Sequence, residues 1–134
     1  MLHNMPVNGS TSVFMTLVEL QGSTTDFFLT GSRFFGNATE QSDWDFYAEY
    51  TYDLKKSMSL QGWKEAKACQ YRMDPNVATV LKKSGIHVQL VRHLKIKHVC
   101  QEALRPFITQ LGKAEQRWLW HAAYIMYLTG RNSR

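Results

Sequence analysis

The sequence predicts one α/β domain of the α+β kind, in which helices flank a mixed β-sheet and two further helices end the chain. Helix-like and strand-like segments follow one another in the order helix, strand, helical turn, strand, helix, hairpin and two helices, which suits a sheet covered by helices. The 134 residues, 44% of them hydrophobic, provide one core and are too few for two domains.

The first half of the chain is expected to contain a lead, a helix and two strands. Residues 1–10 are polar and are predicted as a flexible lead to a core of residues 11–93. Serine and threonine can cap a short first helix, and Gly22 is expected to end it. The β-prone run 26–30 predicts one strand, and the aromatic-rich run 44–51 predicts the next.

A helix and a hairpin are expected to follow. Asp53 can cap a helix that continues to about Gln70. The runs 77–81 and 86–91 flank a Lys-Lys-Ser-Gly turn. They predict a β-hairpin with a turn slightly longer than the tightest kind.

The chain is expected to end in a helix pair within residues 97–129. The first helix covers about 97–111 and is broken near Pro106, because proline cannot donate a backbone hydrogen bond. The second helix covers 113–128 and is expected to end at Gly130.

Two segments near the end of the chain have alternative interpretations. The aromatic run 117–124 is expected to pack on the sheet as an amphipathic helix, although it could stack a base or receive a partner. The basic run 92–98 could bind triphosphate or an RNA backbone, or it could be a solvated edge.

Charge is unevenly placed along the chain. Up to Tyr50 the sole lysine or arginine is Arg33, against six acidic residues, whereas 15 basic residues face five acidic ones from Thr51 onward. An acidic patch followed by a basic surround suits a metal site that also attracts phosphate. An unevenly charged solvated surface would have the same composition.

Other features argue against redox, secreted and membrane classes. Cys69 and Cys100 are too far apart for a CxxC motif, so two reduced thiols are expected, with a disulfide as the alternative. Residues 1–11 lack the apolar run of a signal peptide. The longest apolar stretch, 119–128, is about half the length needed to span a membrane. We therefore expect a cytoplasmic protein that does not enter a membrane.

The segment between the first two strands contains the candidate phosphate-binding residues. Gly31 allows a sharp turn after the first strand and a close approach of a phosphate to the backbone. If Ser32 begins a helical turn, its hydroxyl and the free N–H groups there can hold an anion. Arg33 adds a positive charge beside them.

The second strand begins with two aspartates. Asp43 and Asp45 are two residues apart, so in a strand they project from one face, ~6.5 Å apart along the chain. Two Mg²⁺ ions in a phosphoryl-transfer site lie ~3.5–4 Å apart, so such a pair can hold one ion jointly and reach a second. Trp44 and Phe46 would face the core and set the register. The alternatives are a helix cap at Ser42-Asp43 or a solvated surface pair.

Together these residues resemble the signature of the DNA polymerase beta-like nucleotidyltransferase superfamily, and most closely its minimal single-domain members. In that family the loop typically reads Gly-Ser-Arg-x-x-Gly-x-Ala-x-x-x-Ser-Asp-x-Asp. Every specified position is matched by this chain, at Gly31, Ser32, Arg33, Gly36, Ala38, Ser42, Asp43 and Asp45. The resemblance is close over residues 14–51 and looser to about residue 93.

The resemblance implies a single nucleotidyltransferase-like domain over residues 1–134. Gly31, Ser32 and Arg33 would bind the nucleotide, and Asp43 and Asp45 would be catalytic and would bind Mg²⁺ or Mn²⁺. The reaction implied is transfer of a nucleoside monophosphate from an NTP to an acceptor, which could be a protein, an RNA or a small molecule. A protein partner or a homo-oligomer is also compatible with such a domain.

The chain departs from the family at a third carboxylate, which active members usually have on a later strand. The matching run 85–91 has Gln89 there. An amide cannot accept a proton, and a lost general base typically costs ~10²–10⁴ in rate. Glu49 lies on the same face as Asp45 but ~13 Å further along, whereas His87 shares a face with Gln89 and could act as the base.

Two functional classes therefore follow from the sequence. The first is an active nucleotidyltransferase. The second is a degenerate module of the same fold that binds nucleotide or a protein partner without efficient turnover. A plain RNA-binding domain is a weaker third class, because the chain has no recognisable RNA-binding motif.

Overall fold

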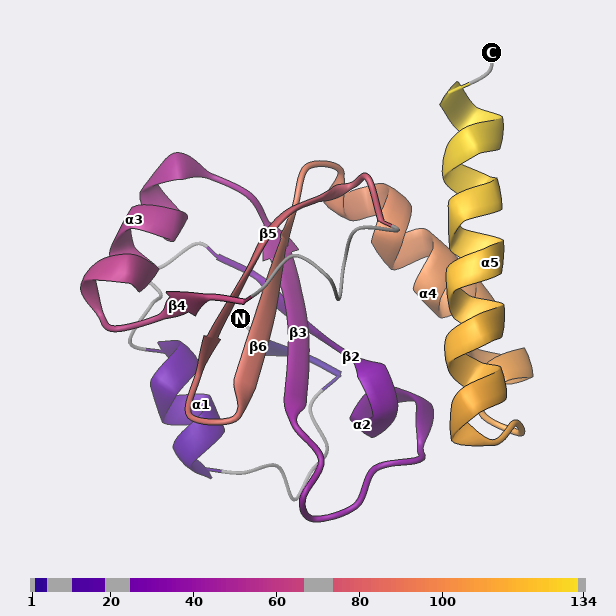
Figure 1. The fold of residues 1–134 in the computed structure, drawn as a ribbon, viewed down its shortest axis with the longest axis horizontal. Coiled ribbons are helices and arrows are strands. Elements are labelled where there is room, and N and C mark those ends of the chain that lie inside the picture. The colour runs from indigo at the N-terminus through magenta and orange to yellow at the C-terminus, as the bar shows by residue number, and fades with distance from the viewer. Residues whose placement is uncertain (1, 5–10, 19–24, 67–73, 133–134) are drawn as a thin grey trace.

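The computed structural model describes residues 2–4, 11–18, 25–66 and 74–132. Within these ranges five helices surround one six-stranded mixed sheet (Figure 1), so the predicted α+β class is confirmed. The elements are β1 (Leu2–His3), α1 (Thr11–Val18), β2 (Phe27–Thr30), α2 (Gly31–Phe35), β3 (Trp44–Glu49), α3 (Tyr52–Leu60), β4 (Lys64–Glu65), β5 (Val77–Lys83), β6 (Ile86–Val91), α4 (Leu94–Ile108) and α5 (Lys113–Asn132).

The strands lie in the order β1-β2-β3-β6-β5-β4. The pairs β1/β2 and β3/β6 are parallel, and the other three pairs are antiparallel. β3 and β6 therefore form the centre of the sheet, although 36 residues separate the end of one from the start of the other. This long-range pairing brings the aspartate segment next to the hairpin.

Alternate residues of β3 point to opposite faces of the sheet. On one face Phe46 and Ala48 are buried and Trp44 packs at the edge of the core, as predicted. The core extends to α1, α3 and β6 through Val13, Leu17, Leu54, Met58, Val88 and Leu90. Figure 1 shows α1 and α3 on this side of the sheet and α4 and α5 on the other.

The opposite face of β3 contains Tyr47, and α4 covers it with polar side chains. Gln101 is fully buried; its amide donates to the Leu29 carbonyl at 3.0 Å and to the Tyr47 hydroxyl at 3.3 Å. The Thr30 hydroxyl donates to the same Gln101 side chain. Tyr47 is also 2.9 Å from Nδ1 of His98. Because each buried polar group has a partner, this interface avoids the cost of unpaired donors and acceptors.

A second buried contact attaches α4 to the sheet. The Lys97 ammonium donates to Asp74 Oδ2 at 3.0 Å and to the side-chain oxygen of Gln89. Both members of the ion pair are buried. Burial lowers the pKa of Lys97, and the neighbouring Asp74 carboxylate opposes that shift.

The helix predicted to run from Asp53 to about Gln70 is wrong in both its cap and its length. The Thr51 side chain accepts from the Leu54 N–H at 3.1 Å and is the cap. α3 ends at Leu60, and Lys64 and Glu65 form β4, because they pair with β5. Cys69 and Gln70 lie outside the described residues, whereas Cys100 is a buried free thiol.

The hairpin turn is tighter than predicted. Ser84 and Gly85 have φ angles of 51° and 77° and form a two-residue connection between β5 and β6. Positive φ at both central residues matches the twist of the flanking strands. β5 therefore extends to Lys83, which the sequence prediction had left in the turn.

The terminal segments also differ in detail from the prediction. Leu2 and His3, predicted to lie in a flexible lead, form β1 against β2, whereas residues 5–10 and Gly22 are outside the described residues. α4 begins earlier than predicted and ends two residues after Pro106. α5 continues past Gly130. No helix in the described ranges has the length and apolar character that crossing a membrane requires.

The prediction that 117–124 forms an amphipathic helix is confirmed, but this helix packs against α4 and α2 and not on the sheet as predicted. Trp120 and Tyr124 are buried in α5 and stack with ring centroids 5.0 Å apart. Trp118, on the same helix, is 73% exposed. α5 therefore packs through one face only.

A candidate site of two carboxylates and a histidine

Gly31 forms a sharp turn at the end of β2. Its φ is 71°, a left-handed conformation that glycine adopts without penalty. A Cβ atom built on Gly31 would lie 2.5 Å from Oδ2 of Asp45. The absence of a side chain at Gly31 therefore leaves the room that the Asp45 carboxylate occupies.

Asp43 and Asp45 come to this turn from the start of β3. The register of β2 and β3 places Asp45 directly opposite Thr30. The Asp45 side chain is 30% exposed and that of Asp43 is 55% exposed. The fold thus brings both carboxylates to the end of the sheet where Gly31 lies, with access to solvent.

The side chain that meets both carboxylates is His87. Its Nδ1 is 3.3 Å from Asp45 Oδ1, and its Nε2 is 3.9 Å from Asp43 Oδ2. β6 runs parallel to β3, and the register places His87 directly opposite Asp45. Both carboxylates therefore converge on one imidazole.

Gln89 does not occupy the third position that the sequence comparison assigned to it. It lies opposite Tyr47, and its side-chain oxygen accepts from Lys97 under α4. His87 and Gln89 share a face, but two residues along a strand correspond to a shift of about 6.6 Å. The expectation that Gln89 faces the aspartates is therefore wrong, and His87 takes that place.

The electrostatics of the site favour a charged His87. The hydrogen bond with Asp45 raises the pKa of His87, and the charges of Asp45 and Asp43 add to this effect. Burial and the neighbouring Lys82 ammonium oppose it. When protonated, the imidazole offsets part of the negative charge of the two carboxylates.

Arg33 makes its contacts with the loop that precedes β3. Its guanidinium donates to the Ser42 carbonyl at 2.7 Å and to the Glu40 carbonyl at 3.3 Å. Its Cζ also lies 4.2 Å from the centre of the Trp44 ring, which is a cation–π distance. Arg33 therefore fixes the loop leading to Asp43, and its predicted contact with a nucleotide stays a prediction.

Ser32 follows Gly31 in the short helix α2. Its carbonyl accepts from the Gly36 and Asn37 N–H groups at 2.8 and 2.9 Å. The Ser32 side chain is partly exposed, and among the described residues no protein group pairs with its hydroxyl. Gly31 lies beside Asp45, whereas the predicted phosphate contacts of Gly31 and Ser32 stay predictions.

Sequence reasoning missed two lysines that belong to the same end of the sheet. The strand registers place Lys64 opposite Lys82 and Lys82 opposite His87. With Asp45 these residues form one row across four strands. The Lys-Lys pair before the turn was visible in the sequence, but Lys64 was assigned to a helix, so its pairing could not be predicted.

The carboxylate pair suits a divalent cation. Mg²⁺ and Mn²⁺ prefer oxygen ligands, and Mg²⁺ commonly uses one or two carboxylates completed by water and substrate phosphates. Asp43 and Asp45 provide that donor set. Over the described ranges, no group of three or more His, Cys, Asp and Glu side chains is arranged to hold a metal ion by itself. Water and phosphate oxygens would have to supply the remaining ligands.

Comparison with known proteins found no counterpart: no protein-family model matches the chain, and neither the curated proteins nor the solved structures contain a match.

Proposed function

We propose that this protein is a Mg²⁺-dependent nucleotidyltransferase, which transfers a nucleoside monophosphate from an NTP to an acceptor hydroxyl. The observation that carries the proposal is the meeting of the Asp43 and Asp45 carboxylates at His87, beside the Gly31 turn. The loop of residues 31–45, with its resemblance to the DNA polymerase beta-like superfamily, and the mixed sheet also support it. On this proposal the domain has the nucleotidyltransferase fold.

Each residue of the site then has a defined role. Asp43 and Asp45 would hold Mg²⁺ or Mn²⁺, which would supply positive charge to the phosphates and to the acceptor hydroxyl. The Gly31 backbone and the Ser32 hydroxyl contact the phosphates. Arg33 keeps the loop, and therefore Asp43, in place through its carbonyl contacts.

The proposed reaction is an in-line displacement. The acceptor oxygen forms a bond to the α-phosphorus, and the bond from that phosphorus to the oxygen that bridges it to the β-phosphorus breaks. Pyrophosphate leaves with the electron pair. His87 lies next to both carboxylates. A cation held by Asp43 and Asp45 would offset their charge and so favour the neutral imidazole, which accepts the hydroxyl proton. A cytoplasmic location, with its supply of NTP, fits this chemistry.

A second function is favoured by the residue at the third position. At the position where the family has a third carboxylate, this chain has His87, whose Nδ1 lies 3.3 Å from Asp45 Oδ1. A module in which His87 permanently offsets the carboxylates would bind nucleotide or a protein partner without efficient turnover. This alternative shares the binding residues of the enzyme and differs from it in turnover.

The proposal is tested by label transfer. The purified protein is incubated with each α-³²P-labelled NTP, Mg²⁺ or Mn²⁺, and cell extract as a source of acceptors. We expect label on an acceptor with the wild type and none with Asp43→Asn/Asp45→Asn. NTP binding without transfer from any NTP would favour the binding module, and the absence of both would contradict both functions.

A further inference from the structure

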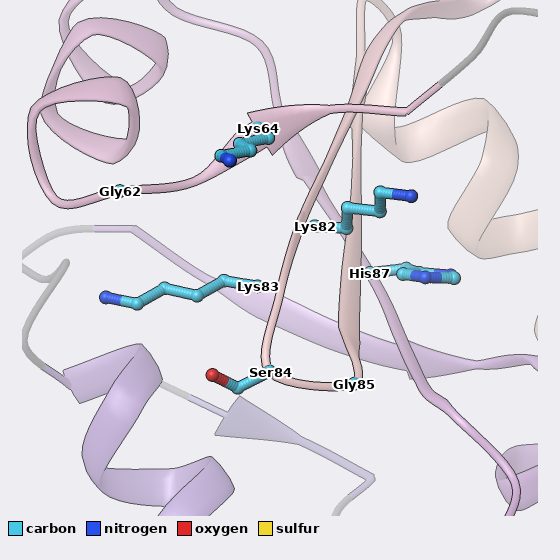
Figure 2. Close-up of a pocket in the computed structure, with 7 residues that line it drawn as sticks. All are labelled: Gly62, Lys64, Lys82, Lys83, Ser84, Gly85 and His87. Carbon is cyan, nitrogen blue, oxygen red and sulfur yellow. The ribbon is translucent and has the colours of Figure 1, made fainter.

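A pocket lies beside His87, towards β4, the strand at one edge of the sheet. Its volume is about 310 Å³, and it is lined by Gly62, Lys64, Lys82, Lys83, Ser84, Gly85 and His87. Figure 2 shows the side chains of Lys82 and His87 extending to the same side of the hairpin and that of Lys83 to the other. The pocket therefore adjoins the carboxylate site through a shared residue, His87.

The charge of the pocket is positive. Lys64 and Lys82 are exposed and stand opposite each other on β4 and β5. Lys83 donates to the Gln61 carbonyl at 2.6 Å, so its ammonium is bound to the turn that follows α3. No acidic side chain lines the pocket. Lys64 and Lys82 thus bring two exposed positive charges to the pocket lining, and lysine binds phosphate as a point charge.

The position of the pocket relative to the proposed nucleotide follows from the geometry of phosphoryl transfer. In an in-line displacement the attacking and leaving oxygens lie on opposite sides of the phosphorus. The proposed function puts the departing phosphates at Gly31 and Ser32, which lie on the β2 side of Asp45. The acceptor must then approach from the β6 side, where His87 and the pocket lie.

We propose that Lys64 and Lys82 bind a phosphate of the acceptor, so that the attacking hydroxyl belongs to a nucleotide, either free or at the end of a single-stranded nucleic acid. This inference rests on the proposed function. The volume is at the small end of ligand pockets, ~300–1,000 Å³, and suits one phosphorylated sugar. A serine or tyrosine hydroxyl of a protein would leave both ammonium groups without a phosphate partner.

The test measures binding of a fluorescent single-stranded RNA pentanucleotide by anisotropy, with Lys64→Gln/Lys82→Gln as the variant. Lys56→Gln/Lys113→Gln is the matched control, because it removes the same charge from two exposed lysines on α3 and α5. We expect the lysine-pocket variant to raise the Kd at least about tenfold relative to the control. Its plot of log affinity against log salt should flatten by ~0.7, the value for one lost phosphate contact on a single strand.

Thermal stabilisation by NTP and Mg²⁺ is measured on the same proteins and should be equal in variant and control. Competition by unlabelled nucleoside monophosphate against the pentanucleotide separates the two sources of the phosphate. Equal Kd values for variant and control would overturn the inference. Loss of NTP stabilisation in the variant would also overturn it, because the lysines would then hold the NTP. The inference would also be overturned if labelled nucleotide were transferred to a protein in the extract at the same rate by the wild type and by Lys64→Gln/Lys82→Gln. The proposed function itself fails separately, if NTP does not stabilise the wild type.

Discussion

At the scale of single residues, Gly31 is the position where backbone conformation and site geometry depend on each other. Gly31→Ala would both strain a φ of 71° and displace the Asp45 carboxylate. Gly36→Ala is the matched control, because Gly36 has a φ of 96° and its added Cβ would meet nothing within 4 Å.

We expect each alanine to lower the free energy of unfolding by about 1–2 kcal/mol, the usual cost of a left-handed residue. Only Gly31→Ala should also weaken NTP–Mg²⁺ binding, because only it moves Asp45. Urea unfolding and NTP titration measure the two effects. Equal NTP affinities in both variants would show that the Asp45 carboxylate does not depend on Gly31.

The contrast between His87 and Gln89 is a second test at this scale. His87→Asp replaces the proposed base with a carboxylate opposite Asp45. On the proposed reaction it should slow nucleotidyl transfer, whereas on the alternative function, in which His87 only offsets the carboxylates, it should raise transfer at least about tenfold. Gln89→Asp should not raise transfer, because its side chain would meet Lys97. Transfer rates with labelled NTP measure both. A slower His87→Asp enzyme would identify His87 as the base already in use, and a faster Gln89→Asp enzyme would restore Gln89 to the third position.

At the scale of elements, the attachment of α4 depends on the buried Lys97–Asp74 pair. Lys97→Met leaves Asp74 buried without its counter-charge and should cost about 3–5 kcal/mol of unfolding free energy. Lys97→Met/Asp74→Asn removes both charges and should cost less. Lys95→Met, on the exposed side of the same helix, should change stability by less than about 0.5 kcal/mol. Urea unfolding of the three variants compares them, and a double variant less stable than Lys97→Met would refute this account of the pair.

The packing of α5 predicts a pH dependence through His121. Its Nδ1 is buried without a hydrogen-bond partner in the described part of the chain. Burial lowers the pKa of His121, and the charges of Lys97 and Arg117 lower it further, while Asp74 opposes them. Below about pH 6.5 the unfolded chain therefore takes up a proton that the folded chain resists. Stability from this group is present above that pH and is lost as the pH falls towards the folded-state pKa.

The measurement is the free energy of unfolding from pH 8 to pH 5 for the wild type and His121→Gln. We expect the wild type to lose more stability than the variant over this interval, because glutamine does not titrate. Other groups contribute to both proteins and cancel in the difference. A variant that loses as much stability as the wild type would show that His121 titrates equally in the folded and unfolded chains.

At the scale of the whole molecule, ligand binding is linked to global stability. A ligand bound only by the native state stabilises it by about 2.7 kcal/mol at 100 times its Kd. NTP with Mg²⁺ should therefore raise the melting temperature, and Asp43→Asn/Asp45→Asn should abolish the rise while leaving the fold intact. Thermal unfolding with and without NTP measures this. A rise that survives in the double variant would place the nucleotide elsewhere, for instance on the basic run 92–98.

Local features of the chain were sufficient for much of the fold and part of the site. The turn at Gly31 could be predicted because a glycine directly follows a β-prone run. Strand periodicity predicts that Asp43 and Asp45 share one face of the strand and that Phe46 points to the other. These properties depend on neighbouring residues, so they can be derived from sequence alone.

Pairing between distant segments decided the remainder. Strand periodicity alone predicts that His87 and Gln89 share a face of β6. Which residue of β3 each of them lies opposite depends on the register between β3 and β6. β4 forms because Lys64 pairs with Lys82, although local sequence favoured a longer helix. Register is set by the packing of whole elements, which no local pattern contains. The sequence by itself determined the turn and the aspartate pair, and the tertiary structure determined that a histidine and two lysines complete their row.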